Sequence, residues 1–205
     1  MKREYVVKLL TFLVLFAPYL NAYENDGLLL QGQTGLAMPL SPPFLTDYSN
    51  TGVCFGGGIG VDVKKNITIL FSYSNSTFNT ERGYIPADHH AYAHQVLMSF
   101  MHFTRELCSI FDPFYRLSAG YTLLRSPDYY RESDYFHGMN IAENFIQRAV
   151  SKNGPTIGLG VGVSYPLSEE SSRLLFELFS AACFLQPELY SMVGARLGIF
   201  FTIGS

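Results

Sequence analysis

The composition of this 205-residue chain is unusual for a soluble domain. Charged residues make up only 15% of it, against roughly a quarter in typical soluble domains, whereas aromatic residues also reach 15% although tryptophan is absent. A net charge of −3 provides no basic field for nucleic acid, and three cysteines without a C-x-x-C pair favour neither a zinc site nor a disulfide framework. Part of the surface is therefore expected to face something other than water.

The chain begins with the pattern of a secretory signal peptide. A short basic start, MKREYVVK, precedes twelve mostly apolar residues, LLTFLVLFAPYL, which are too few to span a membrane. The residues LNA at 20–22 end on the small residue that a signal peptidase requires. We therefore predict cleavage after Ala22, which leaves residues 23–205 as one mature domain; a retained anchor helix is the alternative.

Eight segments with a period of two residues follow, each about as long as a tilted strand needs to cross a bilayer, roughly 9–11 residues. The segment TIGLGVGVSYPL shows the pattern best, because large apolar residues alternate with glycine or serine along it. The fourth segment is apolar on both faces, so its orientation stays open. The eight predicted strands cover residues 27–38, 52–63, 67–78, 93–104, 113–124, 156–167, 173–184 and 190–203.

The connections between these segments also alternate. Long polar loops are predicted at 39–51, 79–92 and 125–154, and short ones at 64–66, 105–112 and 166–172. The last connection, around 185–189, is short but falls on the long-loop side. Long loops at one end and short turns at the other indicate an up-and-down transmembrane β-barrel. Within the third long loop, the apolar residues of NIAENFIQRAVSK stand near helical spacing, which predicts either a short amphipathic helix or an irregular loop.

The two faces of the segments fit a lipid environment. In lipid, every backbone polar group needs a partner inside the protein, and a closed barrel provides one without an edge strand. Its outer face must be apolar, and the interior of an eight-stranded barrel is just wide enough for side chains to fill. Small residues on the inner face leave room there for larger polar neighbours.

Charged residues within the predicted strands all share the small-residue face. Together with two glutamines they are predicted to form a polar network inside the barrel: Gln31, Gln33, Asp62, Arg116, Glu177 and Arg196. If the last hairpin turns between Gln186 and Pro187, Glu177 stands opposite Arg196, which predicts an ion pair. Such a pair either fixes the register of the barrel or acts as a gate or proton path.

Three stretches resemble the outer-membrane-protein β-barrel family, whose members include small OmpA-like and opacity-like barrels: GVCFGGGIGVDVKKNITILFSYSNSTF at 52–78, GPTIGLGVGVSYPLSEESSRLLFELF at 154–179 and VGARLGIFFTI at 193–203. The resemblance implies eight antiparallel strands, a periplasmic C-terminus and insertion by the barrel-assembly machinery, with no shared catalytic residues. One feature departs from the family. Such barrels usually end on an aromatic residue, whereas here Phe200 and Phe201 are followed by TIGS.

Three groups of residues are candidates for further chemistry. A metal site is conceivable at Asp88, His89, His90 and His94, although loop histidines are more often solvated. A lipid hydrolase is conceivable at His102, Thr104 and Glu106, where a rim histidine is the more ordinary reading. Surface-recognition contacts are conceivable in the third long loop, where self-packing is equally expected, at Tyr129, Tyr130, Tyr135 and Phe136.

The sequence therefore predicts an all-β, eight-stranded antiparallel barrel in the outer membrane of a Gram-negative-type bacterium. We expect a structural or surface-recognition role without catalysis, cofactor or metal. The expected partners are outer-membrane lipid and lipopolysaccharide, the assembly machinery, and an extracellular partner that the sequence does not identify. The alternatives are a narrow pore, a lipid-modifying hydrolase, and a soluble lipocalin-like barrel with the opposite polarity.

Overall fold

The computed structural model describes residues 27–41, 46, 50–64, 66–79, 90–104, 110–126, 129–131, 145–147, 150–168, 172–185 and 188–203. The predicted signal peptide, residues 1–22, lies outside them. Ten strands are described: β1 Leu28–Ser41, β2 Gly52–Lys64, β3 Ile67–Asn79, β4 His90–Phe103, β5 Asp112–Ser126, β6 Tyr129–Arg131, β7 Phe145–Gln147, β8 Val150–Ser168, β9 Ser172–Leu185 and β10 Glu188–Ile203. No helix among the described residues is long and apolar enough to cross a membrane.

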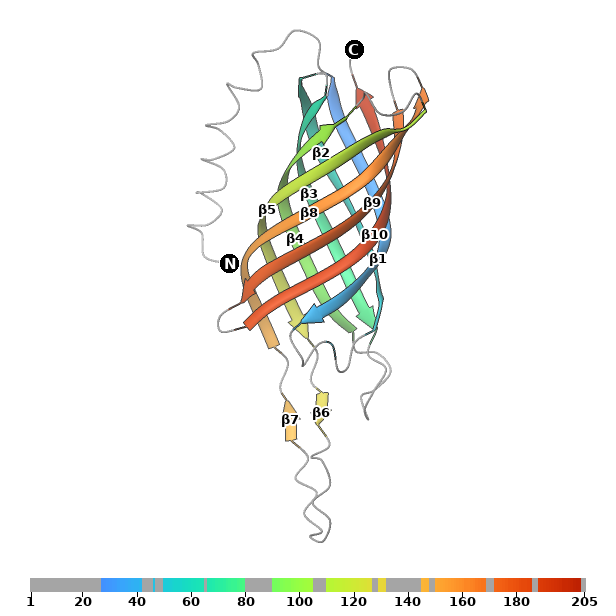
Figure 1. Cartoon of the computed structure of the whole chain (residues 1–205). Coiled ribbons are helices and arrows are strands. Elements are labelled where there is room, and N and C mark those ends of the chain that lie inside the picture. The colour runs from blue at the N-terminus through green and yellow to red at the C-terminus, as the bar shows by residue number, and fades with distance from the viewer. Residues whose placement is uncertain are drawn as a thin grey trace.

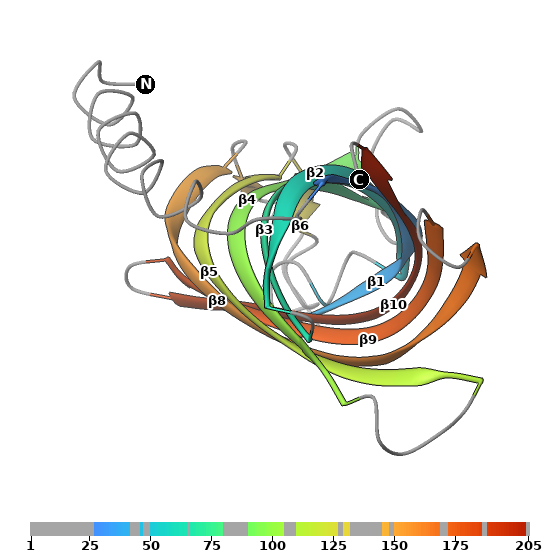
Figure 2. The same cartoon turned by 90° about the horizontal axis from the view of Figure 1, so that it is seen from above.

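Eight of these strands close into one antiparallel barrel in the order β1-β10-β9-β8-β5-β4-β3-β2 (Figure 1). The seam between the first and last strands closes in full register, from Leu28 opposite Ile203 to Met38 opposite Val193. Viewed along its axis, the sheet forms a ring without a free edge (Figure 2). The predicted fold class is thus confirmed, and each predicted segment lies within one barrel strand or overlaps most of it.

The barrel has two different ends. We call the end with the β2–β3, β4–β5 and β8–β9 connections the short-turn end. We call the other end, with the β1–β2, β3–β4, β5–β8 and β9–β10 connections, the long-loop end. The strands reach further than predicted at the long-loop end: β4 begins at His90 and β8 begins at Val150. The first and last residues of the predicted loop 125–154 therefore belong to the paired strands β5 and β8.

The helix predicted within NIAENFIQRAVSK is wrong for the part that the structure describes. Residues 145–147 form β7, which pairs antiparallel with β6, and β8 begins at Val150 (Figure 1). β5 and β8 run side by side to Ser126 and Val150, so the two arms that leave them are already adjacent. Adjacent antiparallel arms satisfy one another's backbone groups, whereas a short isolated helix is marginally stable.

The two faces of the barrel differ as the alternation predicts. Large apolar side chains point outward and are exposed on every barrel strand; for example Ile157 is 55% exposed, Val161 59% and Leu197 51%. Arg116 and Glu177 point inward and are only 2% exposed. This polarity contradicts the lipocalin-like alternative, in which the apolar face would line the interior. In β4, whose orientation was open, the buried set runs from Ala91 through Gln95 to Phe103.

An arginine placed on the outer face tests whether that face lies in hydrocarbon. Leu159 is 64% exposed at mid-strand in β8, whereas Leu189 is 46% exposed at the long-loop end of β10. We expect Leu159→Arg to lower the free energy of unfolding in lipid vesicles by roughly 2–4 kcal/mol, and Leu189→Arg by about 1 kcal/mol or less. Urea titration of the folded gel band measures both. Equal, small losses for the two variants would contradict a lipid-facing wall.

Candidate functional sites in the barrel interior and wall

The barrel interior is filled in three layers. An apolar cluster occupies the short-turn end, formed by Leu70, Met101, Phe103, Phe114, Leu175 and Phe200. A second apolar cluster occupies the long-loop end and includes Phe78, Leu124, Leu185, Tyr190 and Met192. Between them lies a belt of buried polar residues from several strands, among them Ser72, Gln95, Arg116, Thr122, Thr156, Glu177 and Arg196. The polar middle is therefore covered by apolar side chains toward both ends.

Two arginines hold one glutamate at the centre of this belt. The register places Arg196 opposite Glu177, as the hairpin arithmetic predicts. Arg196 donates two hydrogen bonds of 2.9 Å, from Nε to Oε2 and from Nη2 to Oε1 of Glu177. Arg116, from β5, brings its Nη2 to 3.4 Å from Glu177 Oε2. A bidentate, charge-assisted pair of this kind fixes both distance and orientation between two strands.

Glycines on neighbouring strands make the space for these large side chains. A Cβ added to Gly160 would lie 2.0 Å from Glu177 Oε1. A Cβ added to Gly194 would lie 2.7 Å from the ring of Phe179, on which the Arg196 guanidinium stacks with Cζ 4.7 Å from the ring centre. The small residues of the alternating pattern are therefore the sites into which charged and aromatic residues of adjacent strands extend.

The three charged residues of the cluster do not balance. Two arginines against one glutamate give it a charge of +1, and a buried guanidinium remains protonated. Arg116 Nη2 also lies 3.2 Å from Met101 Sδ, and its Nε has no hydrogen-bond partner among the described residues. Arg196 thus makes the stronger interaction with Glu177, and Arg116 makes the weaker one.

A ladder of hydrogen bonds crosses the interior from β3 to β8. Ser74 donates to Gln95 at 3.5 Å, Gln95 donates to Thr122 at 3.1 Å, and the hydroxyls of Thr122 and Thr156 are 2.7 Å apart. The predicted interior network did not include these residues. Thr122 stands on the polar face of a predicted strand and could have been chosen, but Gln95 could not, because the orientation of its strand was open.

The remaining predicted interior residues lie nearer the ends of their strands. Gln31 donates a 3.1 Å hydrogen bond to Gln33 on the inner face of β1, and Gln31 Oε1 is buried without a partner in the described part of the chain. Asp62 accepts a hydrogen bond from Thr68 across the β2–β3 hairpin at the short-turn end. All six predicted residues thus belong to inward-facing positions, although the structure ties only three of them into the charged cluster.

The structure describes the metal and hydrolase candidates only in part. His94 points outward, with its Nδ1 2.8 Å from the hydroxyl of Tyr73. Asp88 and His89 lie outside the described residues, and within the described ranges no three His, Cys, Asp or Glu side chains could hold a metal ion. His102 contacts Asn66 and Tyr115, while the Thr104 hydroxyl donates to the Pro113 carbonyl. Glu106 lies outside the described residues.

The candidate recognition loop is described only in part. Tyr129 and Tyr130 belong to β6, in the small hairpin that extends beyond the barrel at the long-loop end (Figure 1). Tyr135 and Phe136 lie outside the described residues. The pairing of β6 with β7 thus provides regular backbone structure within the third loop.

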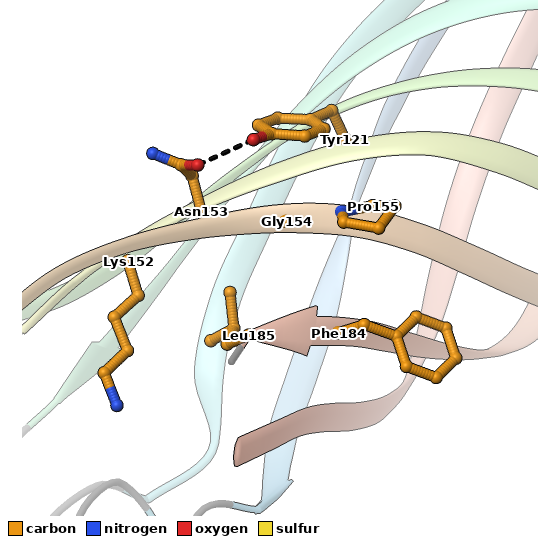
Figure 3. Close-up of a pocket in the computed structure, with 7 residues that line it drawn as sticks. All are labelled: Tyr121, Lys152, Asn153, Gly154, Pro155, Phe184 and Leu185. Carbon is orange, nitrogen blue, oxygen red and sulfur yellow. Dashed lines mark hydrogen bonds between the residues drawn. The ribbon is translucent and has the colours of Figure 1, made fainter. Parts of the chain in front are cut away.

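A pocket of about 360 Å³ opens in the barrel wall near the long-loop end, where β8 and β9 separate. The pairing between β8 and β9 ends at Thr156 opposite Cys183. Beyond this pair, β8 is hydrogen-bonded only to β5, and β9 only to β10. Beyond that point, Lys152 of β8 forms an ion pair with Glu188 of β10. The pocket is lined by Tyr121, Lys152, Asn153, Gly154, Pro155, Phe184 and Leu185 (Figure 3).

Comparison with known proteins shows the fold. No protein-family model and no curated protein matches the chain. Among solved structures, neisserial surface protein A is similar with a TM-score of 0.62 at 11% identity, over 88% of this chain and 100% of that one. Outer membrane protein OprG from Pseudomonas aeruginosa has a TM-score of 0.50 at 7% identity, over 87% and 97% of the two chains. The chain has the fold of a small outer-membrane β-barrel. At these identities the likeness concerns the fold alone.

Removing each arginine in turn tests the asymmetry of the charged cluster in this outer-membrane-type barrel. Arg196→Met takes away both short hydrogen bonds of Glu177 and is expected to lower the free energy of unfolding by about 3 kcal/mol. Arg116→Met leaves the bidentate pair intact and removes the unbalanced charge, so its effect should stay within about 1 kcal/mol. Urea unfolding in detergent measures both. Equal losses would show that the two arginines contribute alike.

A pair of glycine substitutions tests the packing of the interior. Gly160→Ala places a methyl group against the Glu177 carboxylate and should cost roughly 1–3 kcal/mol, as overpacking does. Gly32 faces outward, and a Cβ there would meet only Ile199 Cγ2, at 3.9 Å. Gly32→Ala is therefore the matched control and should leave the barrel at least as stable. The temperature at which the folded gel band disappears compares the two, and similar melting would contradict the steric role of Gly160.

Proposed function

We propose that this protein is an integral outer-membrane barrel with a structural or surface-recognition role and no catalytic activity. One observation carries the proposal: apolar residues cover the outside, while charged residues are buried inside. Soluble proteins have the opposite arrangement, because burying an unpaired charge is costly and exposing a continuous apolar wall promotes association. The likeness in fold to OprG and neisserial surface protein A supports a bacterial outer membrane as the location.

The proposed orientation places the long-loop end outside the cell. An even number of strands brings the start of β1 and the end of β10 to the short-turn end, which in bacterial barrels faces the periplasm. The long-loop end then carries the β6–β7 hairpin, which includes Tyr129 and Tyr130, to the cell surface. Aromatic residues provide large, rigid contact areas at low entropic cost, which suits them to recognition. The partner that they contact is not identified by the barrel itself.

The filled interior favours this role over that of a pore. Leu70 and Met101 at the short-turn end, and Phe78 and Tyr190 at the long-loop end, are 0% exposed. Together with the bidentate Arg196–Glu177 pair, these side chains occupy a lumen that eight strands make narrow. A conducting path would require two apolar layers and one ion pair to move.

Three measurements test the proposal. We expect the protein in the outer-membrane fraction, extracted only by detergent, with an unboiled gel band that migrates faster than the boiled one. Proteinase K added to intact cells should cut between residues 127 and 149 and spare the barrel strands. In planar bilayers the purified protein should give no conductance steps.

Other results would contradict the proposal in different ways. Stable single-channel steps would favour the narrow pore. A changed acyl pattern after incubation with lipopolysaccharide would favour the lipid-modifying hydrolase. Recovery of folded protein from the periplasm without detergent would exclude a membrane location altogether.

A further inference from the structure

The open seam between β8 and β9 has features that the proposed role does not use. Gly154 approaches β9 so closely that a Cβ on it would lie 2.2 Å from the Phe184 carbonyl oxygen. The Gly154 carbonyl accepts contacts from the Thr156 hydroxyl and the Cys183 thiol, both at 3.4 Å. The β8–β9 pairing ends beside Pro155, which has no backbone N–H to donate, and the pocket lies at this end of the seam.

The pocket combines an apolar platform with polar groups at its edge. The exposed rings of Tyr121 and Phe184, which are 49% and 51% exposed, stand on either side of Pro155 (Figure 3). The Tyr121 hydroxyl donates a 2.6 Å hydrogen bond to Asn153 Oδ1, and the Asn153 nitrogen points away from the tyrosine. The Lys152–Glu188 ion pair lies at the loop side of the pocket, with side chains 28% and 39% exposed.

The outward face of β8 next to the pocket is continuously apolar. From Pro155 toward the short-turn end, the outward residues of β8 are Ile157, Leu159 and Val161, which are 55%, 64% and 59% exposed. Polar groups therefore stand at the end of a long apolar track. This is the pattern that fits an amphiphile whose chains lie along the wall and whose headgroup reaches the pocket.

The charges near the pocket favour an anionic headgroup. Lys152 is the charged residue among those that line the pocket, whereas its partner Glu188 is not one of them. The Lys152 ammonium group donates hydrogen bonds, which suits the acceptor oxygens of a phosphate. The aromatic and proline platform suits the flat face of a ring, which a sugar has and a glycerol headgroup lacks.

We propose that this pocket binds the phosphorylated sugar headgroup of an outer-leaflet glycolipid. Lys152 contacts a phosphate, the Asn153 amide contacts a sugar hydroxyl, Tyr121, Pro155 and Phe184 support the sugar ring, and the acyl chains follow β8. Glu188 holds Lys152 in place and competes with the phosphate for it. The inference rests on the proposed membrane location and orientation.

Native mass spectrometry of the purified full-length protein in detergent, titrated with diphosphorylated lipid A, tests the site. We expect one tightly bound lipid, and binding about tenfold weaker for Lys152→Gln and for Phe184→Ala, because each loses one principal contact. Lys64→Gln and Phe201→Ala are the matched controls, since both residues are exposed at the short-turn end. They should bind lipid A as the unaltered protein does.

Glu188→Gln distinguishes a role of Lys152 in binding lipid from a purely structural role of the Lys152–Glu188 ion pair. It keeps the size of the side chain but removes the carboxylate that competes for Lys152, so lipid A should bind several-fold more tightly. If the ion pair only holds the seam together, Glu188→Gln and Lys152→Gln should weaken binding alike, and that result would overturn the proposal.

Two comparison lipids complete the test. Dephosphorylated lipid A should bind about tenfold more weakly, and phosphatidylglycerol, which has a phosphate without a sugar, should also bind weakly. Equal affinity for phosphatidylglycerol would mean a general anion surface and would overturn the glycolipid site. A heat-modifiable barrel in the outer membrane that binds no lipid A would overturn this inference alone, whereas a protein that needs no detergent would overturn the proposed function.

Discussion

The narrowness of an eight-stranded lumen is the constraint on which the rest of the structure depends. Because the interior is only as wide as its side chains, each large inward residue needs a small one on a neighbouring strand. Glu177 occupies the space above Gly160, and Phe179 the space beside Gly194. The inward glycines thus provide the space that the large charged and aromatic side chains occupy. The same fit explains how a bidentate ion pair and a stacked ring can occupy one level of the barrel.

The outer face follows from a second constraint, which acts on the backbone. A closed sheet satisfies every ladder position, so the outside has only side chains to present to its surroundings. These are large and apolar along the middle of the strands, and the interior in turn receives the polar groups. Arg116 illustrates how a polar group is accommodated in the interior. Its Nε has no hydrogen-bond partner among the described residues, but its charge is compensated by Glu177, whose Oε2 lies 3.4 Å from Arg116 Nη2.

The period of two was enough to predict eight strands and their inward faces, because each strand has one clearly smaller face. It also fixed the Glu177–Arg196 register, since a tight hairpin leaves little choice of pairing. It failed where that contrast is weak: Gln95 lies on a strand that is apolar on both faces. The helix alternative for the third loop was wrong, in the part that the structure describes, for another reason. Spacing alone does not reveal that the arms of the third loop leave adjacent strands, where pairing is available to both. The pairing of β8 with β9 ends at Thr156 although both strands continue, to Val150 and Leu185, and the alternating pattern does not distinguish paired from unpaired strand positions.

A filled lumen moves the search for function to the surfaces that remain. One apolar layer at each end separates the charged belt from the outside, so a molecule that approaches the barrel contacts only its rim and its outer wall. On the wall, regular pairing presents a uniform face, and a specific contact requires an interruption. The separation of β8 from β9 is such an interruption, and it lies beside the loops rather than at mid-barrel. Recognition by the loops and recognition by the wall would therefore occur at one end of the molecule, where a bound headgroup and the β6–β7 hairpin could present a joint surface.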